Sequence, residues 1–126
     1  MRTVVVLAAV MGFLGVGLGA FGAHALRQRL GEERLKTYQT GIQYHLIHAL
    51  AMLLTGVLAG MGSSGRGWYE TAGWLFFVGI VLFSGSLYLL ALERLERKWG
   101  LLTPLGGLFF LSGWAAVAIR MGMSAH

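Results

Sequence analysis

The polar side chains that could bind a ligand or carry a proton fall in three short segments of a largely apolar chain. His24 lies near the end of a first apolar stretch, Tyr44 and His48 lie about one helical turn apart in a second, and Ser84, Ser86 and Tyr88 lie close together in a third. Neutral imidazole is a ligand for haem iron and for metals, and the hydroxyl groups donate and accept hydrogen bonds. The predicted polar layer consists of His24, Tyr44, His48, Ser84, Ser86 and Tyr88.

Three interpretations of this layer are open. In the first, the side chains bond one another and nearby carbonyl groups and fix the helix register, at about 0.6 kcal/mol per bond. In the second, they bind a quinone-like head group, or a b-type haem held by His24 and His48. In the third, His45-x-x-His48 and His24 hold a metal ion, although no carboxylate or thiolate accompanies them. We predict the first interpretation, with no cofactor and no metal, and interpret His126 at the carboxyl end as incidental.

The sequence contains none of the familiar catalytic signatures. No Asp, Glu, Lys or Arg lies in the middle of an apolar stretch, where ion- or proton-coupled transporters place such a group. The nucleophile elbow, the phosphate-binding glycine loop and the HExxH helix are missing as well. With no cysteine, the chain cannot form a disulfide or a thiolate metal site. We therefore predict that the protein is not an enzyme.

Four apolar stretches must position the polar layer. The chain of 126 residues is 56% apolar and 12% charged, whereas a soluble domain is about a quarter charged. Each stretch is close to the ~20 residues that cross a bilayer core. The composition predicts an all-α fold, a single domain over residues 1–126, with transmembrane helices at about 3–26, 37–61, 68–92 and 104–120. Thr103 followed by Pro104 is typical of an N-cap and a first helical position.

Glycines on the first predicted helix indicate how it packs. Four recur at spacings of three, four and three residues, so they lie along one face. Each costs about 1 kcal/mol of helix propensity relative to alanine. A face without side chains lets a neighbouring backbone approach closely, and Gly15 with Gly19 forms a GxxxG pair. A glycine pair in the fourth helix is expected to act similarly. The predicted packing glycines are Gly12, Gly15, Gly19, Gly22, Gly106 and Gly107.

Basic residues predict the orientation of the chain. Seven of the ten Lys and Arg residues lie in the connections 27–36 and 93–100, and the other three are Arg2, Arg66 and Arg120. The positive-inside rule therefore places both connections in the cytoplasm and both termini outside. We interpret the net charge of +5 as a topology and lipid-headgroup signal, and we expect no nucleic-acid partner.

This orientation brings the polar residues to one depth. His24 lies three residues before Arg27, about one turn inside the cytoplasmic interface. The second helix enters from the same side with Tyr44 and His48, and the third descends toward that side with its serines and Tyr88. We therefore expect the polar layer in the inner-leaflet half of the bundle.

Four ordered motifs resemble a known family. They are Gly-Ala-Phe-Gly-Ala-His-Ala-Leu at 19–26, Tyr-His-Leu-Ile-His-Ala-Leu-Ala at 44–51, Phe-Ser-Gly-Ser-Leu-Tyr at 83–88 and Pro-Leu-Gly-Gly at 104–107. Together they resemble the small membrane proteins of the domain of unknown function 423 family, which includes YgdD-like bacterial proteins and eukaryotic transmembrane protein 256. The resemblance covers nearly the whole chain. It implies a multi-pass inner-membrane protein without an established activity, and it matches the family histidine to His48 rather than His45.

The functional prediction is a non-enzymatic structural or accessory protein of the bacterial plasma membrane, surrounded by lipid and part of a homo-oligomer or a larger membrane complex. The alternative is a haem- or quinone-binding redox subunit that uses His24 and His48. A third class is a passive pore for a small neutral solute. The outer halves of the predicted helices disfavour a pore, since they contain few polar residues to line it.

Overall fold

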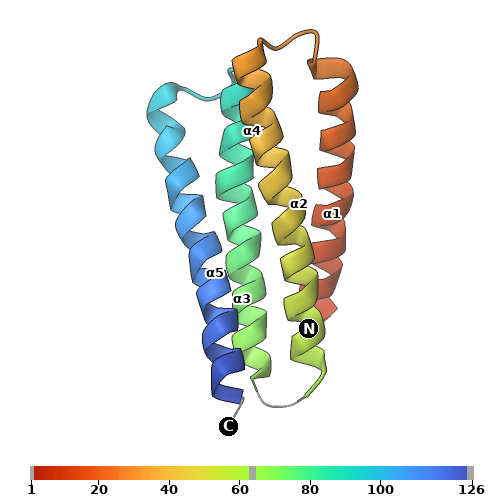
Figure 1. Ribbon diagram of the computed structural model, residues 1–126, viewed down its shortest axis with the longest axis vertical. Coiled ribbons are helices and arrows are strands. Elements are labelled where there is room, and N and C mark those ends of the chain that lie inside the picture. Colours follow the sequence, from red (N-terminus) through yellow and green to blue (C-terminus); the bar gives the residue numbers. More distant parts are fainter. Residues whose placement is uncertain (1, 63–64, 125–126) are drawn as a thin grey trace.

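The computed structural model describes residues 2–62 and 65–124, and these residues form long helices without a strand (Figure 1). The elements are α1 (Arg2–Phe21), η1 (Gly22–Leu26), α2 (Glu32–Gly60), α3 (Arg66–Gly79), η2 (Ile80–Ser84), α4 (Gly85–Ala91), η3 (Arg97–Leu101) and α5 (Leu102–Ser124). Of these, η1 and η2 are π-helical turns, whereas η3 is a 3₁₀ turn. Both π-turns continue an α-helix. Four spans are therefore long and apolar enough to cross a membrane, as predicted: Arg2–Leu26, Glu32–Gly60, Arg66–Ala91 and Arg97–Met123.

The α-helices of all four spans begin slightly before the predicted positions, and α2 differs most. α2 starts at Glu32 rather than near residue 37, because its polar first turns continue without a break into the apolar part. α5 starts at Leu102 and follows directly on η3, so Thr103 is not its N-cap. The Thr103 hydroxyl instead bonds the Ser86 hydroxyl at 2.5 Å. Pro104 still lies in the first turn of α5, where its missing N–H breaks no helical hydrogen bond.

The helices stand side by side in the order α1, α2, α3 with α4, and α5 (Figure 1). Extensive contacts join α1 to α2, α2 to α3 and α3 to α5. Among the described residues, α1 and α5 share no extensive contact, so the row does not close into a four-cornered bundle. Burial follows this order: 44% of the apolar window of α2 is buried, but only 17% of the windows of α1 and α5. The row therefore leaves α1 and α5 open to the membrane.

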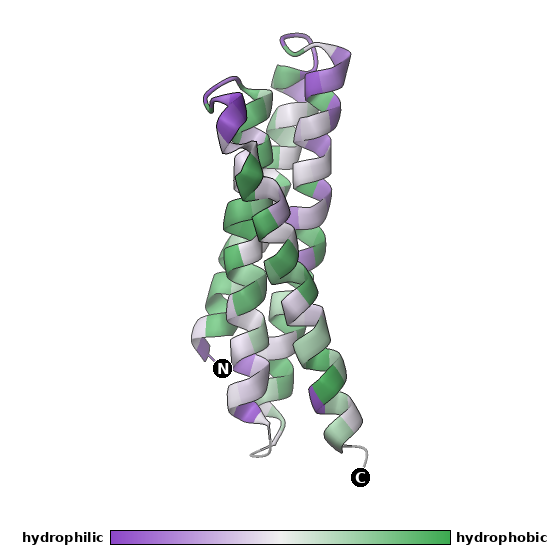
Figure 2. Ribbon diagram, turned by 90° about the vertical axis from the view of Figure 1, so that its left-hand side faces the viewer, coloured by the Kyte–Doolittle hydropathy of each residue, from purple (hydrophilic) through white to green (hydrophobic). Residues whose placement is uncertain are grey.

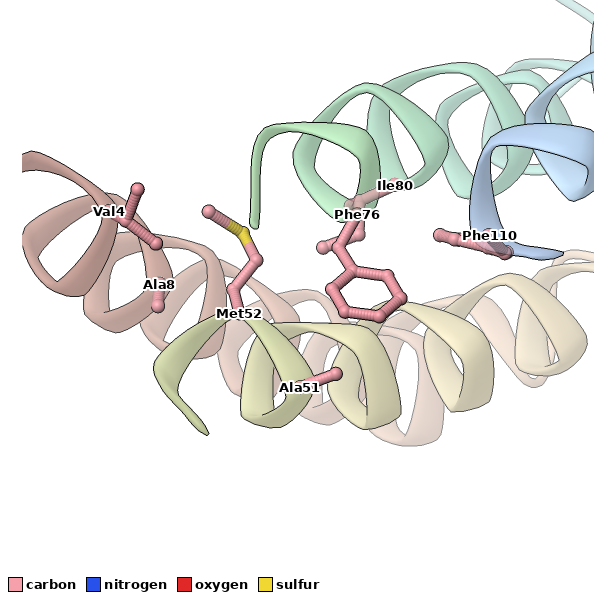
Figure 3. Packing of buried hydrophobic residues seen from close by; sticks show 7 residues of the cluster. All are labelled: Val4, Ala8, Ala51, Met52, Phe76, Ile80 and Phe110. Carbon is pink, nitrogen blue, oxygen red and sulfur yellow. The ribbon is translucent and has the colours of Figure 1, made fainter. Parts of the chain in front are cut away.

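Side chains from all four spans meet in one apolar core (Figure 3). It consists of Val4, Ala8, Ala51, Met52, Phe76, Ile80 and Phe110. A smaller cluster of Leu26, Tyr38 and Ala91 lies toward the other end of α2. Figure 2 shows hydrophilic residues gathered at the end of the row that carries the α1–α2 and α4–η3 connections. Both clusters contain residues of the first three spans, so these spans are packed together near both ends of the row.

Candidate functional site

The candidate site is built on α2, which carries two buried histidines. His45 and His48 are each only 4% exposed. They lie three residues apart, about 60° around the helix axis, and contact different neighbours. His45 reaches α1 and α4, whereas His48 packs against α5.

His45 joins three helices through two hydrogen bonds. Its Nε2 lies 2.7 Å from the backbone carbonyl oxygen of Met11, and its Nδ1 lies 2.8 Å from the hydroxyl of Tyr88. A carbonyl oxygen only accepts, so Nε2–H donates to Met11 and the neutral ring accepts the Tyr88 proton at Nδ1. Both ring nitrogens are therefore used within the chain.

Gly15 gives the His45 ring access to this carbonyl. In a helix, the side chain of residue i+4 leans toward the carbonyl of residue i, and Gly15 follows Met11 by four residues. A Cβ atom on Gly15 would lie 3.0 Å from Cδ2 of His45 and 2.6 Å from a methyl carbon of Leu46. The missing side chain thus leaves the Met11 carbonyl uncovered on the face toward α2.

The same arrangement recurs one heptad away. The Tyr38 hydroxyl donates to the carbonyl of Leu18 at 2.5 Å, and a Cβ on Gly22 would overlap the Tyr38 ring. Tyr38 and His45 are seven residues apart on α2, as are Gly15 on the antiparallel α1 and Gly22 at the start of η1. Two α2 side chains therefore each donate to an α1 carbonyl that a glycine uncovers.

The rest of the predicted glycine face contributes unequally. A Cβ on Gly19 would lie 3.3 Å from Ile42, which is a tight contact, but one on Gly12 would meet nothing within 4 Å. Gly12 thus lies at the edge of the α1–α2 interface. On α5, a Cβ on Gly106 would overlap the backbone of Phe83, whereas one on Gly107 would make only an ordinary contact at 3.9 Å.

His48 is bonded on both sides as well. Its Nδ1–H donates to the carbonyl of Tyr44 at 2.8 Å, one turn back on α2. Its Nε2 accepts from the indole N–H of Trp114 at 2.9 Å, which fixes the tautomer because indole only donates. The ring stacks on Phe110 with centroids 3.6 Å apart. His48 therefore ties α2 to α5.

The two predicted serines connect the third span to its neighbours. Ser84 in η2 is fully buried, and its hydroxyl donates to the carbonyl of Gly41 at 2.7 Å. Ser86 donates to the carbonyl of Phe83 at 2.9 Å and bonds Thr103 on α5. Ser84 thus joins η2 to α2, and Ser86 joins α4 to α5.

His24 is not brought to this site. It lies exposed on η1, and no hydrogen bond or ring contact joins it to His48 within the described residues. A haem held by His24 and His48 does not fit, because both nitrogens of His48 are already bonded. The described residues also contain no group of three His, Asp or Glu side chains that could hold a metal ion, so the His45-x-x-His48 pair stays without a third ligand. His126 lies outside the described residues.

A lipid-facing groove opens beside His48. It has a volume of about 390 Å³ between α2, η2 and α5. Tyr44, 40% exposed, lines it with its ring packed against Phe83 at 4.7 Å. Among the described residues, no side chain or backbone group bonds the Tyr44 hydroxyl. The groove therefore presents one unsatisfied donor among aromatic rings.

Three residues of the site were missing from the predicted layer: Tyr38, His45 and Trp114. A spacing signal could have found two of them. Tyr38 and His45 lie a heptad apart, as do Gly22 and Gly15, and antiparallel neighbours with matching heptads face each other. Trp114 offered no such signal, because its partner lies on a helix that is not adjacent in the chain.

Comparisons with known proteins show the family of this chain. Residues 18–107 match the family described as a protein of unknown function, DUF423. The chain is 44% identical over 119 residues to the UPF0382 membrane protein YwdK of Bacillus subtilis, covering 94% of this chain and 95% of the relative. It is 42% identical over 118 residues to the UPF0382 inner membrane protein YgdD of Escherichia coli, covering 94% and 88%. No solved structure matches the chain. The chain is thus a membrane protein of the DUF423 family, whose function is described as unknown.

Proposed function

We propose that this protein is a non-enzymatic structural or accessory component that associates laterally with other membrane helices. The observation that carries the proposal is the internal bonding of the site. Both nitrogens of His45 and both nitrogens of His48 are used within the chain. Such bonding supports the interpretation that these side chains fix the helix register, because neither imidazole retains a nitrogen for a ligand.

The open row of helices supports lateral association. α1 and α5 each pack mainly against one neighbour, and they expose large apolar side chains elsewhere. Phe13 on α1 is 79% exposed and Leu111 on α5 is 67% exposed. In a membrane these faces meet either lipid or another helix. We propose a homo-oligomer or a larger complex, with the connections 27–36 and 93–100 in the cytoplasm and both termini outside.

Cross-linking in the native membrane tests lateral association. Because the chain has no cysteine, Phe13→Cys and Leu111→Cys each introduce one thiol on an exposed face. We expect oxidation to give a product of twice the monomer mass, or a product with a second protein, for at least one variant. Met52→Cys, at a fully buried position, is the matched control. Monomer alone from both exposed variants would contradict the proposal.

A second candidate function is the binding of a quinone-like head group in the groove beside His48. The Tyr44 hydroxyl would donate to a ring carbonyl, and Phe83 and Phe110 would pack against the ring. Protein purified from its native membrane in a mild detergent should then contain extractable quinone, and Tyr44→Phe should lose most of it. A quinone-free wild-type preparation would contradict this candidate. A Soret band would contradict the first proposal.

A further inference from the structure

A second groove lies at the charged end of the helix row, between the start of α2 and the end of α4. Its volume is about 700 Å³. Four charged side chains line its mouth: Glu33, Arg34, Glu93 and Arg97. Leu87 and Leu90 line it on α4, which runs from the apolar middle of the row toward the charged end. The groove is therefore polar where it faces water and apolar where it enters the membrane.

Glu93 is held at this mouth by an unusual backbone conformation. Its φ of 58° lies in the left-handed region, where glycine is favoured. The N–H of Glu93 bonds the carbonyl of Leu90, and the N–H of Arg94 bonds the carbonyl of Leu89, so the chain reverses at the end of α4. Oε1 of Glu93 lies 3.1 Å from Nη1 of Arg34 on α2. The ion pair thus bridges the two walls of the groove.

The two remaining charges have no such partner. Within the described residues, no ion pair involves Arg97 or Glu33, although both line the groove. One guanidinium and one carboxylate at the same mouth complement a ligand that carries a phosphate and an ammonium group. The leucines below complement an acyl chain. An amphiphile with both charges and a hydrocarbon tail is an amine-bearing phospholipid.

We propose that this groove binds one phospholipid whose headgroup contains a phosphate and a primary ammonium group. Arg97 bonds the phosphate, because guanidinium forms paired hydrogen bonds with phosphate oxygens. Glu33 accepts from the ammonium group, and an acyl chain lies along Leu87 and Leu90. The site does not depend on lateral association, since one chain supplies all of its residues.

Native mass spectrometry of the full chain in a mild detergent tests the proposal. Phosphatidylethanolamine, phosphatidylcholine and phosphatidylglycerol are added separately, and the bound fraction is measured at each lipid concentration. We expect one phosphatidylethanolamine to bind more tightly than either of the other lipids. Loss of a single exposed ion pair corresponds to roughly a two- to fivefold change in affinity, so Arg97→Gln should weaken binding by about that factor.

Matched variants separate the groove from general surface charge. Lys98 is the residue next to Arg97, and its ammonium group pairs with Glu96. Lys98→Gln therefore removes one positive charge near the groove but not from its lining, and it should leave the affinity unchanged. Glu33→Gln should reduce the preference for phosphatidylethanolamine over phosphatidylglycerol, whereas Glu32→Gln should not. An equal loss in Lys98→Gln, equal affinity for the three lipids, or displacement of the lipid by millimolar inorganic phosphate would overturn the proposal.

Discussion

His45 and His48 place two imidazole rings inside a membrane-spanning segment with every ring nitrogen hydrogen-bonded. Polar groups without partners are costly in hydrocarbon, so this bonding explains how the rings are tolerated there. His45 receives its α1 acceptor because Gly15 leaves the Met11 carbonyl uncovered. At the residue scale, the site has two kinds of residue. Some side chains donate hydrogen bonds to backbone carbonyls, and glycines leave those carbonyls uncovered.

The bond between His45 and Tyr88 should be measurable in a double-mutant cycle. His45→Phe, Tyr88→Phe and the double variant should give a coupling free energy of about 0.6 kcal/mol, and no more than about 1.7 kcal/mol. His45→Phe alone should cost more than Tyr88→Phe, because it also removes the bond to Met11. The free energy of unfolding is measured by SDS titration in mixed micelles. Strictly additive effects would rule out the bond.

Gly15 and Gly12 form a matched pair on one helix. Gly15→Ala should lower the free energy of unfolding by about 1–3 kcal/mol, because the added methyl group would overlap Leu46 and crowd His45. Gly12→Ala adds the same group where nothing lies within 4 Å, so it should be neutral or slightly stabilising. The same SDS titration compares the two variants. Equal losses would show that α1 packs on α2 through a different face.

At the element scale, α2 is hydrogen-bonded to each of the other three spans. Tyr38 and His45 bond α1, His48 bonds α5, and the carbonyl of Gly41 accepts from Ser84 in η2. The π-turn η2 lies against α5 at a close approach, since a Cβ atom on Gly106 would overlap the backbone of Phe83. π-Turns are rare and concentrate at functional sites. In this chain, η2 aligns the third span with both neighbours at once.

Gly106 and Gly107 test the α5 contact in the same way. Gly106→Ala would place a methyl group against the backbone N and Cα of Phe83, which cannot turn aside as a side chain can. We expect a loss of about 1–3 kcal/mol in the free energy of unfolding. Gly107→Ala should change it by less than about 0.5 kcal/mol. A larger loss for Gly107→Ala would contradict the α5 register.

At the scale of the whole molecule, the four spans form an open row rather than a closed bundle. The core lies along α2 and α3, while α1 and α5 keep most of their surface for lipid or partners. Charge is distributed unevenly along the row: seven of ten basic residues lie at the end that carries the groove lined by Glu33 and Arg97. Both features concern surfaces, which is where a protein whose two buried imidazole rings are bonded internally can still interact.

Cysteine labelling checks the proposed orientation. Gln28→Cys in the α1–α2 connection and Gly62→Cys at the opposite end each add one thiol to a cysteine-free chain. A membrane-impermeant maleimide applied to intact spheroplasts should label Gly62→Cys and leave Gln28→Cys unlabelled until the cells are opened. The reverse pattern would place the basic connections outside.

The amino-acid sequence by itself determined that the chain is all-α with four membrane-spanning helices, and four of its motifs already identified the family. These properties are local, because apolar length and helix signals are read along one segment at a time. Helix ends depend on tertiary contacts as well: Thr103 has the residue type of an N-cap, but its hydroxyl bonds Ser86 instead.

The tertiary structure alone decided which polar residues share a site. His24 and His45 both lie in membrane-spanning segments, yet only His45 reaches a carbonyl of another helix. Gly12 and Gly15 lie on one face of α1, yet only Gly15 is covered by α2. Helical periodicity determines on which face of its helix a residue lies, but not which neighbouring helix packs against that face. That choice depends on the order and tilt of all four spans, which bring His48 to Trp114 across 66 positions of the chain.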